Sequence, residues 1–214
     1  RTGLFVENPM RQDVEEIGKM MDIHLALNVI LNQRRQIVRV LAGEPQAVMQ
    51  AGIPISREVC QVSLSAPYSL IISSPGGHPK DINIYQSQKG LAHAALVTQP
   101  GGTIILTAAC PEGTGSPHYE NWMMGKSSYT EVIEIFKSEG FRIGAHKAYQ
   151  IARDASRVHL MFCSEMEDRL ARALLLNPVK DFQTALDLAI ADLKPGDRIG
   201  VLPHASTTIP YLKE

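Results

Sequence analysis

The sequence predicts an α/β fold: a layered α/β/α sandwich with a mixed, largely parallel sheet and an added β-hairpin. Short apolar runs recur along the chain, each bounded by glycine, proline or small polar residues, and longer helical patterns separate them. Continuous apolar runs of this kind are typical of strands that are buried on both faces of a parallel sheet. Because no repeat, low-complexity tract or internal linker interrupts the pattern, we expect a single domain over residues 1–214.

The first third of the chain is expected to form a helix, a hairpin and a short second helix. Valine, isoleucine and methionine recur at helical spacing after Pro9, and two later apolar stretches flank a short polar link that suits a hairpin. In chain order, the expected elements are a connector at residues 1–8, a helix at 9–21, strands at 24–31 and 36–41, a short helix at 43–51 and a strand at 59–64.

The rest of the chain alternates strands with helices, which is the pattern of βαβ units. Buried strands are expected at residues 68–72, 103–108, 157–162 and 198–202. One helix is expected to begin near Asp81, and others at residues 119–124, 130–140, 144–156, 165–176 and 181–193. This order of elements is the basis for the predicted sandwich.

The composition narrows the class of protein. The chain has 214 residues, 44% of them hydrophobic and 20% charged, and its formal net charge is −1, as in an ordinary soluble globular protein. A chain without a basic excess is not expected to bind nucleic acid, and no apolar run reaches the ~20 residues of a membrane helix. Cys60, Cys110 and Cys163 are widely spaced and form no CxxC motif, which predicts free thiols and a cytoplasmic protein.

A glycine turn follows the strand at residues 68–72. Gly76 and Gly77 indicate positive φ angles or a close approach of the backbone to another group. Asp81 is placed to cap the helix that follows, and free backbone N–H groups at a helix start favour a carboxylate or a phosphate. The turn therefore predicts an anion site, and His78, which adjoins it, is a further candidate for contact with the ligand.

The helix after this turn has two unlike sides. At about 100° per residue, Ile84, Leu91 and Ala95 share the side that is expected to be buried. The other side carries Tyr85, Gln86 and Lys89. Their phenol, amide and ammonium groups could bind a small anionic, hydroxylated ligand. A solvent-exposed helix face gives the same pattern, so spacing alone leaves both interpretations open.

Other chemistries have weaker support. The seven histidines show no HxxxH or HxH spacing, so no metal site made within this chain is expected. Neither GxGxxG nor GxxxxGK[ST] occurs, and Cys110 has no obvious base near it in sequence, which predicts a buried structural thiol. His93 lies one turn beyond Lys89 on the same face, while the roles of His146 and Lys147 stay open.

Residues 76–90, GGHPKDINIYQSQKG, resemble a signature of the C-terminal domain of the nickel-dependent lactate racemase family. Three further stretches agree with that family in type and order, namely RTGLFVENPMRQDVEE at residues 1–16, CPEGTGSPHYENWM at 110–123 and GAHKAYQIAR at 144–153. The resemblance implies an isomerase that racemises a 2-hydroxy acid by hydride abstraction and return, with a nickel pincer nucleotide as cofactor. It also implies that Tyr85, Gln86 and Lys89 line the substrate side, with Tyr149 about where the family can place an aromatic ring.

The resemblance places the remaining machinery outside this chain. In the family, the lysine that attaches the cofactor, the nickel ligand and the acid/base histidines belong to an N-terminal domain, which is expected to precede Arg1. No catalytic residue and no bound cofactor are therefore expected here, and the chain alone is expected to be inactive. The expected partners are the protein's own N-terminal domain and a small 2-hydroxy acid of undetermined identity, and a homo-oligomer stays open. The alternative is a non-catalytic small-anion binding or regulatory module.

Overall fold

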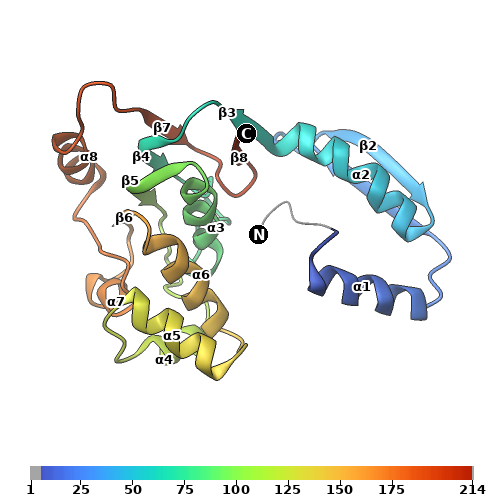
Figure 1. Cartoon of the computed structure of the whole chain (residues 1–214), viewed down its shortest axis with the longest axis horizontal. Helices are drawn as coiled ribbons and strands as arrows, with labels where there is room; N and C mark the ends of the chain where they lie inside the picture. Colours follow the sequence, from blue (N-terminus) through green and yellow to red (C-terminus); the bar gives the residue numbers. More distant parts are fainter. Residues whose placement is uncertain (1–5, 214) are drawn as a thin grey trace. The chain divides into compact units, whose positions relative to one another are not determined.

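The computed structural model describes residues 6–213, and its contacts divide the chain into two compact units, Arg1–Gln61 and Val62–Glu214 (Figure 1). Most of the predicted connector at residues 1–8 lies outside the described residues. Units defined by contacts alone do not decide the number of domains. The single domain over residues 1–214 therefore stays a prediction.

The first unit consists of a helix, a hairpin and a second helix. Its elements are α1 (Pro9–Met20), β1 (Ala26–Leu31), β2 (Ile37–Gly43) and α2 (Pro45–Cys60), and β1 pairs with β2 antiparallel, as predicted. The expected end of α2 at residue 51 is wrong, because the helix continues through Pro54. Gly52 lies against Leu41 and Ile30 of the hairpin, and this packing offsets the backbone hydrogen bond that a proline removes.

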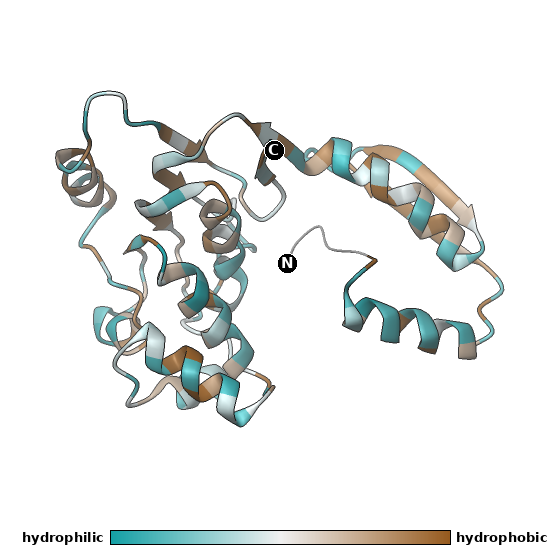
Figure 2. Ribbon diagram, viewed as in Figure 1, coloured by the Kyte–Doolittle hydropathy of each residue, from teal (hydrophilic) through white to brown (hydrophobic). Residues whose placement is uncertain are grey.

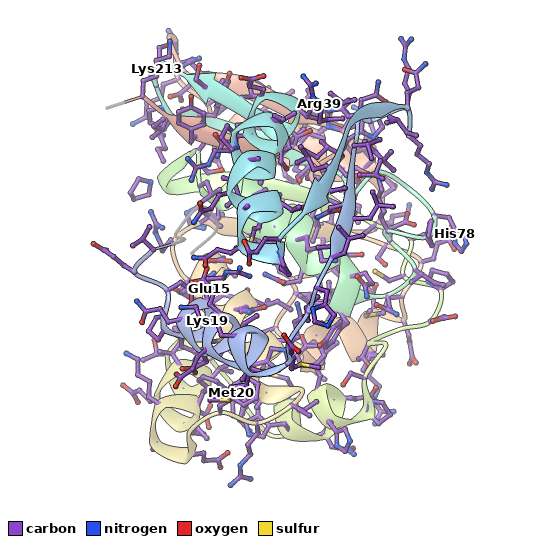
Figure 3. All side chains as sticks on the ribbon, turned by 90° about the vertical axis from the view of Figure 1, so that its right-hand side faces the viewer. Glu15, Lys19, Met20, Arg39, His78 and Lys213 are labelled. Atoms are coloured by element: carbon purple, nitrogen blue, oxygen red, sulfur yellow. The ribbon has the colours of Figure 1, made fainter. Side chains whose placement is uncertain are left out.

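The hairpin keeps one apolar face in solvent. Leu27, Val29 and Val40 are 41–70% exposed on the face away from Gly52, and Figure 2 shows β2 mainly in hydrophobic colours. On α1, Glu15 and Lys19 share one polar side (Figure 3). Among the described residues of this unit only Val48 is buried, so the unit has little core of its own.

The second unit is built on a parallel sheet. The four-stranded sheet has the order β6-β5-β4-β7, and all its pairs are parallel. The strands of this unit are β3 (Gln61–Leu64), β4 (Tyr68–Ser73), β5 (Thr98–Thr107), β6 (His159–Cys163), β7 (Ile199–Leu202) and β8 (Ile209–Leu212). Strand β8, which pairs with β3, was not predicted, because Pro210 within a four-residue strand removes a donor and weakens the pattern.

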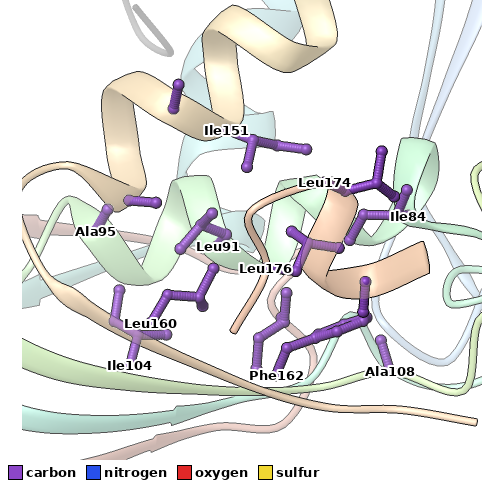
Figure 4. Packing of buried hydrophobic residues seen from close by; sticks show 14 of the residues in the cluster. Ile84, Leu91, Ala95, Ile104, Ala108, Ile151, Leu160, Phe162, Leu174 and Leu176 are labelled. Atoms are coloured by element: carbon purple, nitrogen blue, oxygen red, sulfur yellow. The ribbon is translucent and has the colours of Figure 1, made fainter. Parts of the chain in front are cut away.

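Helices cover both faces of this sheet, which confirms the predicted α/β/α layers (Figure 1). The helices are α3 (Ile84–Ala95), α4 (Pro117–Met123), α5 (Tyr129–Glu139), α6 (Ala145–Ala155), α7 (Asp168–Ala173) and α8 (Phe182–Ala191). Figure 4 shows Leu91 of α3 and Ile151 of α6 packed toward Ile104 of the sheet. On the other face, Ala185 and Ala189 of α8 pack with Leu70 and Ile105.

The start of α3 differs from the expectation. The cap is Asn83, whose side chain accepts a hydrogen bond from the Gln86 amide at 3.0 Å, and Asp81 instead accepts one from the Ala109 amide. Six residues separate the Gly76–Gly77 turn from α3, and they hold no helix that Asp81 could cap. The glycines do have the predicted positive φ angles, 109° and 72°.

The N-terminal amides of α3 all have partners. Those of Ile84 and Tyr85 donate to the carbonyl groups of Gly113 and Thr114, in the loop after β5, and those of the next two residues donate to Asn83. The expectation of free N–H groups that favour an anion at this helix start is therefore wrong. The donors that would meet the anion are already bonded to the protein.

The loop after β5 fits this cap only with glycine at position 115. Gly115 has a φ of 66°, and a Cβ there would lie 2.3 Å from the side chain of Asn83. We expect Gly115→Ala to lower the free energy of unfolding by about 2–5 kcal/mol, because the left-handed conformation is strained and the cap must move. Thermal and chemical unfolding measure this loss.

Gly125→Ala is the matched control, since Gly125 has a φ of 80° with open space at the Cβ position. The loss of unfolding free energy in this control should equal the cost of the backbone conformation alone. The loss in Gly115→Ala should be larger by at least about 1 kcal/mol, the size of a lost cap. Equal losses in the two variants would contradict the role of the Asn83 contact.

Candidate functional site

The polar face of α3 holds the predicted substrate residues. Ile84 and Leu91 are buried, as predicted, whereas Tyr85 and Gln86 are half-buried and Lys89 is exposed. The helix therefore presents a phenol, an amide and an ammonium group on the side away from its core. Their role in binding substrate stays a prediction.

Lys89 and Gln86 are bonded to each other. Lys89 Nζ donates to Gln86 Oε1 at 2.9 Å, which uses the acceptor oxygen of the amide. Four N–H donors are left over, two on the ammonium and two on the amide nitrogen, beside the second lone pair of the amide oxygen. This pair is therefore suited to an oxygen ligand with negative charge.

Gly144 allows helix α6 to begin beside the polar face of α3. Gly144 has a φ of 87°, and a Cβ there would lie 2.6 Å from the backbone nitrogen of Tyr119, at the start of α4. Only glycine allows the backbone of residue 144 to approach α4 so closely. The next residues, His146 and Lys147, lie in the first turn of α6 and contact α3.

His146 meets the phenol of Tyr85. Its Nε2 lies 3.4 Å from Tyr85 Oη, and the two rings meet edge to face with centroids 6.0 Å apart. Its Nδ1 lies 3.3 Å from the carbonyl oxygen of Arg142, to which only an N–H can donate. In the neutral imidazole, Nε2 is then the acceptor, and the Tyr85 hydroxyl donates to it.

Lys147 crosses from α6 to α3. Its Nζ lies 4.6 Å from the centroid of the Tyr85 ring and donates to Gln88 Oε1 at 3.3 Å. Burial, followed by the positive charge of Lys89, lowers the pKa of the Lys147 ammonium below its ordinary value. Lys147 and a tyrosine–histidine pair therefore meet where α3 and α6 pack together, and the charge of Lys89 acts on Lys147.

The remaining candidates lie elsewhere. His78 is exposed on the segment after the glycine turn, and its side chain projects from the ribbon (Figure 3). Tyr149 stacks on Phe136 of α5, with ring centroids 4.6 Å apart. His93 contacts the carbonyl oxygen of Ala205, beyond β7. The roles of His78 and Tyr149 at the substrate stay predictions.

Sequence reasoning named His146 and Lys147 without assigning them a role. Their helical spacing showed that they open a helix, but only the packing of α6 on α3 shows that they face Tyr85 and Gln88. Cys110 is buried beside Ser87, as expected of a structural thiol, and burial raises its pKa. Every helix in the described part of the chain is too short or too polar to span a membrane.

Comparisons with known proteins agree with this fold. A family model described as the lactate racemase C-terminal domain matches residues 64–209, almost the whole of the second unit. The chain is 31% identical over 207 residues to the lactate racemase of Lactiplantibacillus plantarum and 26% identical over 213 residues to that of Thermoanaerobacterium thermosaccharolyticum. The first alignment includes 95% of this chain and the second includes 98%.

The solved structure of the T. thermosaccharolyticum lactate racemase apoprotein superposes on the whole chain with a TM-score of 0.91, at 26% identity, and the chain covers 52% of it. A Thermotoga maritima protein, 15% identical with a TM-score of 0.67, shares the fold. The chain spans about half the length of the curated relatives, 49–50% of each. Because the family model matches well over half of its residues, the chain belongs to the lactate racemase C-terminal domain family.

Proposed function

We propose that this chain is the C-terminal, substrate-closing part of a 2-hydroxy-acid racemase or epimerase similar to lactate racemase. The observation that carries the proposal is the hydrogen-bonded pair on α3, in which Lys89 Nζ donates to Gln86 Oε1 and both groups keep N–H donors for a ligand. Lys89 anchors the substrate carboxylate, and Gln86 and Tyr85 meet its hydroxyl or carbonyl oxygen. The relatives named lactate racemase support the reaction class.

The nickel pincer nucleotide of the family is expected to be held outside this chain. Among residues 6–213, no three His, Cys, Asp or Glu side chains are grouped so that they could hold a metal ion. On the basis of the family resemblance, we place the cofactor and the acid/base histidines on an N-terminal domain. Relatives about twice as long as this chain leave room for such a domain. The part played by this chain is to bind and orient the substrate.

The alternative, a non-catalytic small-anion module, has less support. It was based on the glycine turn and on free amides at the start of α3, but those amides are bonded to Asn83, Gly113 and Thr114. Lys89 and Gln86 are also the residues that match the substrate side of the racemase family. The enzyme is therefore the better interpretation of the same helix.

Replacing Lys89 tests the anchor. In a racemase-length protein that includes this chain, we expect Lys89→Ala to lower kcat/KM by about thirtyfold to several thousandfold, because a substrate carboxylate enclosed in a closed, partly dry cleft would lose its charged partner. Lys89→Arg should restore only part of the loss, since the guanidinium is broader. Gln86→Ala should cost about fivefold, the value of one neutral hydrogen bond. Steady-state racemisation measures all three variants.

Lys137→Ala is the control, since Lys137 is an exposed lysine in the last turn of α5. It should leave kcat/KM and the melting temperature unchanged. Parent-like racemisation by Lys89→Ala would show that the polar face of α3 is only a solvated surface.

The chain alone should fold without catalysing the reaction. We expect the purified 214-residue protein to melt cooperatively and to leave D- and L-lactate unconverted, with or without nickel, because no side chain can accept a hydride. Chiral analysis of the lactate after long incubation is the measurement. Racemisation above the buffer blank would assign the chemistry to this half of the protein.

A further inference from the structure

Lys147 brings a second ammonium group to the polar face of α3. It reaches from α6 to the Tyr85 ring, at 4.6 Å, and to Gln88 Oε1, at 3.3 Å. Lys89 lies one turn beyond Tyr85 on the same helix and is bonded to Gln86. Each lysine thus donates to the side-chain oxygen of one glutamine, and together the two lysines bring two positive charges to the neighbourhood of Tyr85.

Neither ammonium group is neutralised by the protein. Within residues 6–213, no salt bridge joins Lys89 or Lys147 to a carboxylate. Lys147 is half-buried, and the charge of Lys89 acts on it. Two like charges held together in this way repel each other, and a ligand of opposite charge relieves the repulsion.

We propose that Lys89 and Lys147 together recognise a 2-hydroxy acid that carries a second carboxylate, an inference that rests on the proposed function of this site. Lys89 holds the carboxylate next to the hydroxyl, and Lys147 holds the distant one. A monocarboxylate such as lactate neutralises one ammonium group, whereas a dicarboxylate such as malate neutralises both. Lys147 is thus a specificity-determining residue rather than a part of the chemistry.

The side-chain amides of Gln86 and Gln88 are separate reporters for the two lysines, because each lysine donates to one of them. We would titrate the ¹⁵N-labelled chain with lactate, malate and inorganic phosphate and follow both amides by NMR. Malate should shift both amides and bind at least about tenfold more tightly than lactate, which should shift the Gln86 amide alone. Lys147→Met should bring the two affinities within about threefold, chiefly by weakening malate.

Lys137→Met, on α5, is the matched control and should keep the malate preference. A malate preference that survives Lys147→Met would overturn the proposal, and so would a Lys147→Met variant that melts lower and binds both acids as the parent does. Phosphate that shifts both amides as strongly as malate would show a general dianion site and would overturn the substrate class.

Different outcomes would overturn the second-carboxylate proposal and the proposed function. Lactate that shifts the Gln86 amide, with malate leaving the Gln88 amide unmoved, overturns the second-carboxylate proposal and keeps the proposed function. If none of the acids shifts either amide, in this chain and in a racemase-length protein alike, both fall together.

Discussion

The start of helix α3 is the constraint on which the rest of the site depends. Its first amides are bonded to Asn83 and to the loop after β5, so the helix cannot shift along its axis without breaking several backbone hydrogen bonds. Gly115 makes this contact close enough to exclude any side chain at that position. The direction in which Tyr85, Gln86 and Lys89 project is therefore set by the backbone of a neighbouring loop.

A second close approach sets the other half of the site. Gly144 packs against the backbone of α4, and α6 starts immediately after it. The buried contacts between Leu91 and Ile151 hold α6 against α3 farther along. These contacts are apolar or made by the backbone, and the pairs Tyr85–His146 and Lys147–Gln88 add polar contacts between the two helices.

Much of this fold could be predicted from the sequence, because apolar runs and helical spacing report burial directly. The sandwich, the hairpin and the buried side of α3 were predicted correctly. The start of α3 was predicted two residues too early, because Asp81 and Asn83 are both common cap residues and only the folded chain shows which of them accepts from the Gln86 amide. For the same reason α2 was predicted too short: the benefit of packing Gly52 on Leu41 is a tertiary contact that local propensity does not contain.

In the site, too, the residues that are close in sequence could be predicted, and the residue that joins them by a tertiary contact could not. Tyr85, Gln86 and Lys89 are close in sequence, and a helical wheel brings them together. Lys147 joins them from another helix. It donates to Gln88 Oε1, as Lys89 donates to Gln86 Oε1, and it adds a second positive charge near Tyr85. A neutral ligand leaves that excess of positive charge uncompensated, and a cation increases it. The two lysines thus turn a mixed polar surface into one that favours anions.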